Sequence, residues 1–203
     1  MPLPIPLHCI RPNTQNLGVG TGFVVRSGNS KWLVTSVHLV SGLVNTPANL
    51  SFFMSVSFQV VGKNVRLALQ TGISGRYSIA NDPSDGMFFD AMSVKLSGFE
   101  AASLAAYGFY EASSIVAATV GEKILMTGFP GMKLHPKSAT SLGAVVTQVE
   151  GVSVAVSKAG QPGLSGGPAT TSSGLVGLVQ GTTKTPTEGL ITSLLLLKPI
   201  LFS

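Results

Sequence analysis

The sequence contains few cysteines and few charged residues, and each of these properties excludes some classes of function. The single cysteine, Cys9, excludes an internal disulfide and any metal site built on several cysteines. Only 10% of the 203 residues are charged, and 13 basic against 8 acidic residues give a formal net charge of +5. The basic residues are scattered from Arg11 to Lys198 without a cluster, so we expect no nucleic acid partner.

The chain also lacks an apolar run that could cross a membrane. The longest candidate, residues 190–202, is interrupted by Lys198 and Pro199 and falls short of the roughly 20 residues that a spanning helix needs. Prolines at positions 2, 4 and 6 stand where a signal peptide would need an uninterrupted apolar helix. We therefore expect no membrane span, no signal peptide and a cytoplasmic location, in a bacterial cell or a virus-infected host cell.

Turn residues and short apolar segments are abundant. The chain contains 24 glycines and 12 prolines, and its 44% of hydrophobic residues can form a buried core. The pattern favours an all-β barrel or sandwich over a helical fold. Strands are expected at residues 21–26, 31–37, 52–60, 65–70, 87–96, 115–119, 123–127, 142–149, 152–157, 175–180 and 189–192.

An alanine-rich segment interrupts the strand pattern near the middle of the chain. We interpret residues 98–114 as a connector between an N-terminal half, 1–97, and a C-terminal half, 115–203. Near the end, Thr192 or Ser193 is expected to cap a short helix that ends near Pro199.

The clearest candidate for chemistry is Ser165, in the segment Gln161-Pro-Gly-Leu-Ser-Gly-Gly-Pro168. The glycines and prolines predict a tight turn that exposes the hydroxyl and lets the N–H groups of Gly163 and Ser165 face a developing oxyanion. An ordinary hairpin loop would explain the same residues, so the segment alone leaves both interpretations open.

Few residues could act with this serine, because the chain has only three histidines and three aspartates. His38 follows an apolar strand, and an imidazole can serve as a general base near neutral pH. Asp90 stands in a strand that otherwise looks buried, where its carboxylate needs a donor such as an imidazole N–H. Asp82 and Asp85 fit turn positions instead. The histidines have no metal-ligand spacing, so we expect no metal site.

The order His38, Asp90, Ser165 is one of three known chain orders for a Ser-His-Asp triad. Thr35-Ser-Val-His38, Phe89-Asp-Ala-Met-Ser-Val94 and Gly163-Leu-Ser-Gly-Gly-Pro168 resemble the catalytic motifs of chymotrypsin/trypsin-like serine peptidases, of the short, disulfide-free bacterial or viral type. Residues 20–25, 121–130 and 174–181 also resemble strands of that family. The resemblance implies two six-stranded antiparallel β-barrels with the active cleft between them, and a short C-terminal helix is expected at the end of the chain.

The same resemblance implies a serine endopeptidase that acts on polypeptides without a cofactor. Ser165 would be the nucleophile, His38 the general base and Asp90 the residue that orients it, with the N–H groups of Gly163 and Ser165 as the oxyanion hole. Ala159 stands six residues before the nucleophile, where a carboxylate would select basic substrates. We therefore expect cleavage after small or apolar residues, in a pocket formed by Ala159, Gly160, Val179, Gln180 and Gly181.

Two alternatives stay open. A viral self-processing (polyprotein) protease would release itself from a precursor, after which its C-terminus, residues 195–203, would fill the cleft. A catalytically inactive double-barrel module would keep the motifs but bind peptides or serve as a coat protein. The sequence leaves the oligomeric state open in every case.

Overall fold

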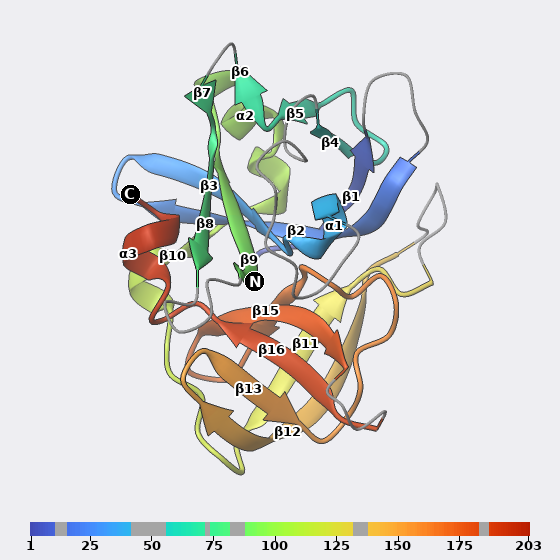
Figure 1. Cartoon of the computed structure of the whole chain (residues 1–203), viewed down its shortest axis with the longest axis vertical. Helices are drawn as coiled ribbons and strands as arrows, with labels where there is room; N and C mark the ends of the chain where they lie inside the picture. Colours follow the sequence, from blue (N-terminus) through green and yellow to red (C-terminus); the bar gives the residue numbers. More distant parts are fainter. Residues whose placement is uncertain (11–15, 42–55, 72–73, 82–87, 132–137, 183–186) are drawn as a thin grey trace.

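The computed structural model describes residues 1–10, 16–41, 56–71, 74–81, 88–131, 138–182 and 187–203 (Figure 1). The N-terminal half is a curled, mostly antiparallel sheet, and the C-terminal half is a closed barrel of six antiparallel strands. The all-β double-barrel prediction is therefore confirmed, although the N-terminal sheet does not close within the part of the chain that is described.

The N-terminal sheet has the strand order β5-β4-β1-β2-β3-β9-β8, with β10 beside β2 in parallel. A separate two-stranded hairpin, β6–β7, adjoins it in sequence. The strands are β1 (Ile5–Ile10), β2 (Asn16–Ser27), β3 (Ser30–Thr35), β4 (Ser57–Val60), β5 (Arg66–Ala68), β6 (Gln70–Thr71), β7 (Ser74–Gly75), β8 (Tyr77–Asn81), β9 (Phe88–Lys95) and β10 (Tyr110–Glu111).

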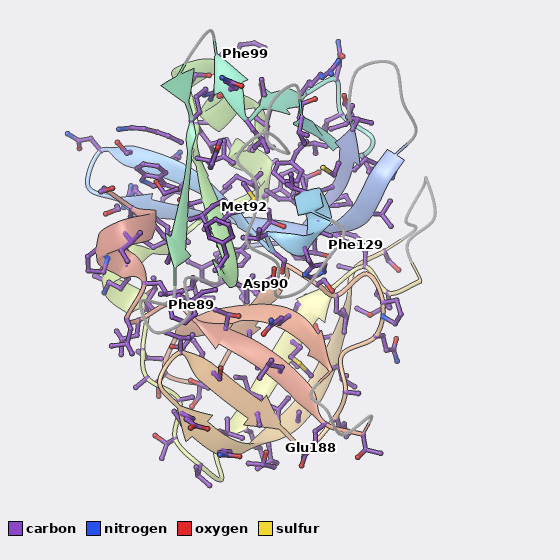
Figure 2. The ribbon with its side chains drawn as sticks, viewed as in Figure 1. Phe89, Asp90, Met92, Phe99, Phe129 and Glu188 are labelled. Atoms are coloured by element: carbon purple, nitrogen blue, oxygen red, sulfur yellow. The ribbon has the colours of Figure 1, made fainter. Side chains whose placement is uncertain are left out.

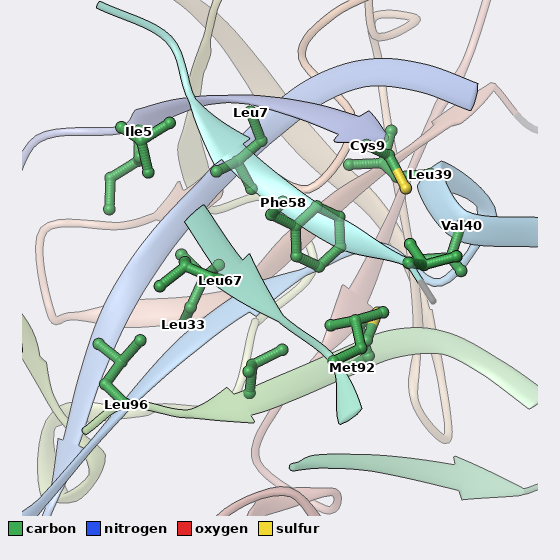
Figure 3. Packing of buried hydrophobic residues seen from close by; sticks show 14 of the residues in the cluster. Ile5, Leu7, Cys9, Leu33, Leu39, Val40, Phe58, Leu67, Met92 and Leu96 are labelled. Atoms are coloured by element: carbon green, nitrogen blue, oxygen red, sulfur yellow. The ribbon is translucent and has the colours of Figure 1, made fainter. Parts of the chain in front are cut away.

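Side chains alternate between the two faces of β9, as they must in a strand. Met92 and Val94 pack into the core of the N-terminal half, which also buries Cys9 (Figure 3). Phe89 and Ala91, on the opposite face, join a second apolar cluster. Strand β9 is thus covered on both sides, which is why its sequence reads as an almost continuous apolar run.

The C-terminal barrel closes in the order β11-β12-β13-β16-β15-β14, which leaves no unpaired edge strand. Its apolar interior includes Met126, Val154, Val179 and Ile191, all fully buried. The strands are β11 (Lys123–Gly128), β12 (Thr140–Glu150), β13 (Ser153–Val156), β14 (Pro168–Thr170), β15 (Leu175–Thr182) and β16 (Gly189–Ser193).

The second apolar cluster joins the two halves. It combines Phe23 of β2, Tyr110 of β10, Leu178 of β15 and Leu201 of the C-terminal helix α3 (Lys198–Leu201). The rings of Phe23 and Tyr110 meet edge to face, 5.7 Å apart. Burial raises the pKa of Tyr110 to about 12, so its phenol stays neutral at this junction.

The expected connector, 98–114, contains α2 (Gly98–Ser103), the 3₁₀ turns Ala105–Tyr107 and Ala112–Ser114, and β10. Ser97 and Glu100 form a reciprocal capping box at the start of α2, which satisfies two N–H groups that a helix end leaves without partners. The Glu100 carboxylate also pairs with Arg76. Burial alone would raise the pKa of Glu100, but the hydrogen bonds from Arg76 and Ser97 outweigh burial and lower it.

Several local predictions were wrong. The strand expected at 31–37 ends at Thr35, and β1 and β14 were not anticipated. Residues 115–119 form no strand beyond a single bridge from Ile115 to Leu175. Of the strand expected at 52–60, residues 57–60 form β4 and residues 52–55 lie outside the described part.

The C-terminal helix starts where it was expected to end. Residues 192–193 still belong to β16, where they pair with residues 177–178 of β15, and both are buried. Pro199 lies in the first turn of α3, where an N–H would have no partner inside the helix, so proline favours a helix start there.

Candidate active site

Asp90 and His38 are joined by two hydrogen bonds. The carboxylate of Asp90 accepts a hydrogen bond from the backbone N–H of His38 at 2.9 Å, and its other oxygen lies 2.6 Å from Nδ1 of the same residue. The Asp90 side chain is only 4% exposed, whereas 18% of the His38 side chain is open to solvent. Two donors from one residue therefore satisfy a carboxylate that could not otherwise be buried.

The local chain path explains this arrangement. After β3 ends at Thr35, a turn closed by a hydrogen bond from Val40 to Val37 leads into the one-turn helix α1 (His38–Ser41). The sequence placed His38 at the end of a strand, but it begins this short helix. Its N–H has no acceptor within the helix and is free to reach the Asp90 carboxylate. Figure 2 shows Asp90 at the end of β9 that lies nearest the barrel.

Ser165 lies in the turn between β13 and β14, as the glycines and prolines predicted. Its hydroxyl donates a hydrogen bond to the carbonyl of Gln180 at 3.3 Å. Its own carbonyl accepts a hydrogen bond from the N–H of Thr21 in β2 at 2.9 Å. The nucleophile candidate of the second half is thus tied directly to a strand of the first half.

Gly166 brings this turn against the chain segment that carries His38. With φ of +80°, it adopts a conformation that favours glycine. A Cβ at this position would lie 2.4 Å from Oγ1 of Thr35 and 3.0 Å from the N atom of Ser36. Because Ser165 precedes Gly166 and His38 follows Ser36 by two residues, the two segments adjoin at the junction of the halves.

The same turn leaves two N–H groups unused. Within the described part of the chain, the N–H groups of Gly163 and Ser165 have no hydrogen-bond acceptor. The carbonyl of Pro162 accepts a hydrogen bond from Gly131 at 2.8 Å. Because the N–H of a trans peptide points opposite to its carbonyl, this bond turns the Gly163 N–H away from Gly131.

The peptide between Leu164 and Ser165 is fixed in the same way. The carbonyl of Leu164 accepts a hydrogen bond from Gly167 at 2.8 Å, so the N–H of Ser165 points away from Gly167. Leu164 itself is 1% exposed and packs in the barrel core. Two unpaired N–H donors beside a serine hydroxyl are the groups that an oxyanion hole requires.

The expected pocket residues lie on two adjacent segments. A Cβ on Gly160 would lie 3.2 Å from Cγ1 of Val179 and 3.3 Å from the carbonyl oxygen of Gly181. Ala159 is hydrogen-bonded through its N–H to the carbonyl of Thr187. Val179 is fully buried in the barrel core, and its N–H and carbonyl are already hydrogen-bonded to Gly167 and Gly166. Gln180 and Gly181 are half-buried.

The C-terminal tail lies on the other side of β9 from the site. The Ser93 hydroxyl donates to the Leu201 carbonyl, and Ala91 shares an apolar cluster with Leu201. Residues 91 and 93 face opposite to residue 90 in a strand, so the tail and the Asp90 carboxylate occupy different faces. The arrangement in which the tail fills the cleft is therefore not found here.

Comparison with known proteins shows the fold. The serine endoprotease from Yersinia pestis matches with a TM-score of 0.60 and 13% identity, over 98% of this chain. The protease domain of MamO from Magnetospirillum magneticum matches with a TM-score of 0.59 and 14% identity, over 98% of this chain and 95% of its own length. The chain has the chymotrypsin-like double-barrel fold.

A structure concerned with the coupled folding and binding of the Sesbania mosaic virus VPg protein also matches, with a TM-score of 0.59 and 16% identity over 97% of this chain and 88% of that one. The chain spans 61% of the length of the Yersinia protein. No family model matches the sequence, and no curated protein matches it either.

Within the described ranges no group of side chains is suited to bind a metal ion. These residues contain no cluster of three or more His, Cys, Asp or Glu side chains able to hold a metal ion. Among the helices that the structure describes, none is long and apolar enough to span a membrane.

Thr21 contacts the candidate site, although it was not identified from the sequence. Thr21 is fully buried and hydrogen-bonds the carbonyls of both Gly163 and Ser165. A threonine in an apolar strand is ordinary in sequence, so only the docking of the two halves reveals it. The flanking glycines, Gly20 and Gly22, were part of the resembling segment 20–25 and were the available signal.

Proposed function

We propose that this protein is a serine endopeptidase that hydrolyses peptide bonds with a triad of Ser165, His38 and Asp90. The observation that carries the proposal is the double hydrogen bond from His38 to Asp90, next to a turn with two unused N–H groups. A buried carboxylate that holds an imidazole by Nδ1 fixes the ring and its tautomer.

The first chemical step follows from that tautomer. With the proton of His38 held on Nδ1 by Asp90, Nε2 is the basic nitrogen. The Ser165 hydroxyl, which rests on the Gln180 carbonyl, would turn to Nε2, lose its proton and attack the peptide carbonyl. Asp90 would stabilise the imidazolium that forms.

The oxyanion of the tetrahedral intermediate would lie between the N–H groups of Gly163 and Ser165. Each such donor contributes about 3 kcal/mol to the transition state in enzymes of this kind. His38 would then return the proton to the leaving amine, which breaks the C–N bond and leaves an acyl group on Ser165. Water, activated by His38 in the same way, would release the acid and restore the serine.

Polypeptides are the proposed substrates, with cleavage after small or apolar residues. Ala159 and Gly160 are half-buried beside Val179 and Gly181, and none of these residues carries a charge. A pocket of this kind discriminates by only about 1–3 kcal/mol per methylene, so the preference would be broad. No cofactor takes part in any step.

A fluorophosphonate probe tests the proposal, because it reacts covalently only with an activated serine. We expect one adduct per chain, located at Ser165 by mass spectrometry. Ser165→Ala would abolish labelling, and Ser173→Ala, which changes an exposed serine outside the site, would leave it intact.

The remaining alternatives predict different results. An inactive peptide-binding or coat module would not be labelled, although it would fold as the wild type does. A self-processing protease would be labelled and would cut a precursor that contains its own termini more readily than an unrelated peptide library.

A further inference from the structure

Thr21 connects the two halves through its N–H and its hydroxyl. Its N–H donates to the Ser165 carbonyl at 2.9 Å, and its hydroxyl donates to the Gly163 carbonyl at 2.7 Å. The same hydroxyl oxygen accepts the N–H of Phe129 at 3.3 Å. The Thr21 carbonyl accepts the hydroxyl of Thr35 at 2.7 Å. The side chain is fully buried, so water cannot replace these partners.

The hydroxyl of Thr21 binds the turn between β13 and β14 that carries Ser165, here called the nucleophile turn, at Gly163. Gly163 has φ of +95°, and a glycine has no side chain that could hold its peptides in place. Thr21 Oγ1 bridges the Gly163 carbonyl to the N–H of Phe129, which follows the end of β11 (Figure 2). Two residues further on, Gly131 fixes the Pro162 carbonyl. One hydroxyl thus links both chain segments that orient the Gly163 N–H.

The close fit leaves little room for another arrangement. A Cβ on Gly163 would lie 2.1 Å from the carbonyl oxygen of Phe129, and a Cβ on Gly128 would lie 2.8 Å from Oγ1 of Thr21. Both positions therefore need glycine so that the backbone can approach the Thr21 side chain and the adjoining turn. The hydroxyl sits at the centre of this contact between β2, β11 and the nucleophile turn.

We propose that Thr21 is a positioning residue: it binds the carbonyls of the peptides that follow Gly163 and Ser165, and so holds the turn in the conformation in which the Gly163 and Ser165 N–H groups face the oxyanion. The proposal rests on the proposed peptidase function. Because Thr21 belongs to the first half and the turn to the second, the oxyanion hole is set only when the two halves are docked. Thr21 makes no contact with the reacting atoms and acts through the two carbonyls that it binds.

The test replaces the hydroxyl without changing the shape of the side chain. We expect Thr21→Val to lower kcat about 10- to 100-fold, somewhat less than the loss of a whole oxyanion-hole donor. KM should change less than about threefold, because substrate binding in the ground state does not use these N–H groups. Thr21→Ser, which keeps the hydroxyl, should retain kcat within about threefold of the wild type. Thr21→Cys takes the place of Thr21→Val if the latter does not fold.

A transition-state mimic separates positioning from general damage to the fold. A peptide boronic acid forms a tetrahedral adduct with the serine and places an oxygen in the oxyanion hole, so its affinity should fall in Thr21→Val by the same factor as kcat. Ser57→Ala is the control, because it also removes one buried hydroxyl of the N-terminal half, which accepts a hydrogen bond from Arg66 and has no contact with the turn that carries Ser165. It should lower the melting temperature while kcat and boronic acid affinity stay within about threefold of the wild type.

Each outcome decides the matter. Unchanged kcat and boronic acid affinity in folded Thr21→Val would overturn the role of Thr21, as would equal losses in Ser57→Ala. If the wild type neither reacts with the fluorophosphonate nor cleaves peptides, the peptidase function fails first, and the role of Thr21 fails with it. An active wild type with an unaffected Thr21→Val would refute the positioning role alone.

Discussion

Asp90 holds His38 by two atoms at once, the backbone N at 2.9 Å and the ring Nδ1 at 2.6 Å. The carboxylate therefore fixes both the start of α1 and the orientation of the imidazole. A contact that served only to satisfy a buried acid would need neither the ring nor this geometry. It is the arrangement that a general base with a free Nε2 requires.

Replacing Asp90 by Asn tests the role of this carboxylate. We expect kcat to fall about 10³- to 10⁴-fold with KM nearly unchanged, because the amide can donate to Nδ1 and move the ring proton to Nε2. Steady-state kinetics on a peptide substrate measure both constants. Glu111→Gln, which makes the same change in an exposed ion pair with Arg26, is the control and should keep full activity. An active Asp90→Asn would remove Asp90 from the mechanism.

Gly166→Ala should destabilise the protein by about 2–5 kcal/mol, because it combines a strained positive φ with severe overpacking. Its Cβ would lie 2.2 Å from the Thr21 carbonyl oxygen. Chemical denaturation measures the free energy of unfolding. Gly143→Ala is the control for this substitution, because a Cβ at position 143 meets nothing within 4 Å. It should change the free energy of unfolding by less than about 0.5 kcal/mol. Equal effects at the two positions would contradict the close docking of the halves.

Glu100→Gln should lower stability at pH 7 by about 1–2 kcal/mol, because Glu100 receives charge-assisted hydrogen bonds from Arg76 and caps α2. The pKa of Glu100 is lowered in the folded protein, so its contribution is complete above the pKa of the unfolded chain. It is lost as the pH falls through the folded pKa. Denaturation of both proteins at pH 7 and at about pH 3 should show the difference shrinking at the lower pH. A difference that is constant with pH would mean that the charge plays no part.

The C-terminal tail is expected to stabilise the protein and not to block it. Leu201→Ala should cost about 2–5 kcal/mol, because Leu201 is fully buried between the halves. Ile200→Ala, at a side chain that is 45% exposed, should cost far less. Removing residues 195–203 should lower the melting temperature without increasing fluorophosphonate labelling. A truncated chain that is labelled faster than the full chain would restore the self-blocking alternative.

Candidate site residues could be chosen from the sequence where a short local pattern identified them. The glycines and prolines around Ser165 identified its turn, and Asp90 was singled out because a carboxylate in an apolar strand needs a partner. His38 was singled out as a candidate base, but its position in α1 was not expected, because the preceding residues Val34 and Val37 read as a continuing strand. The turn there depends on the Asp90 carboxylate, which lies 52 residues away in sequence.

Features that depend on long-range docking could not be predicted. Thr21 looks like any strand threonine until the nucleophile turn packs against it. Strand β1 begins among prolines, which argue against a strand, yet it pairs with β2 and β4 on its two sides. The strand at 189–192 was expected, but the helix was placed directly after it and begins only at Lys198, because the intervening residues pack between the two halves, a contact that no local pattern expresses.

Cleavage of a mixed peptide library by the wild type and by Ser165→Ala tests the central claim most directly. We expect the wild type to cut after small or apolar residues, and Ser165→Ala to lose about 10⁶-fold in kcat with an unchanged melting temperature. Cleavage that persists in Ser165→Ala, or a folded wild type that cuts no peptide in the library, would contradict the account.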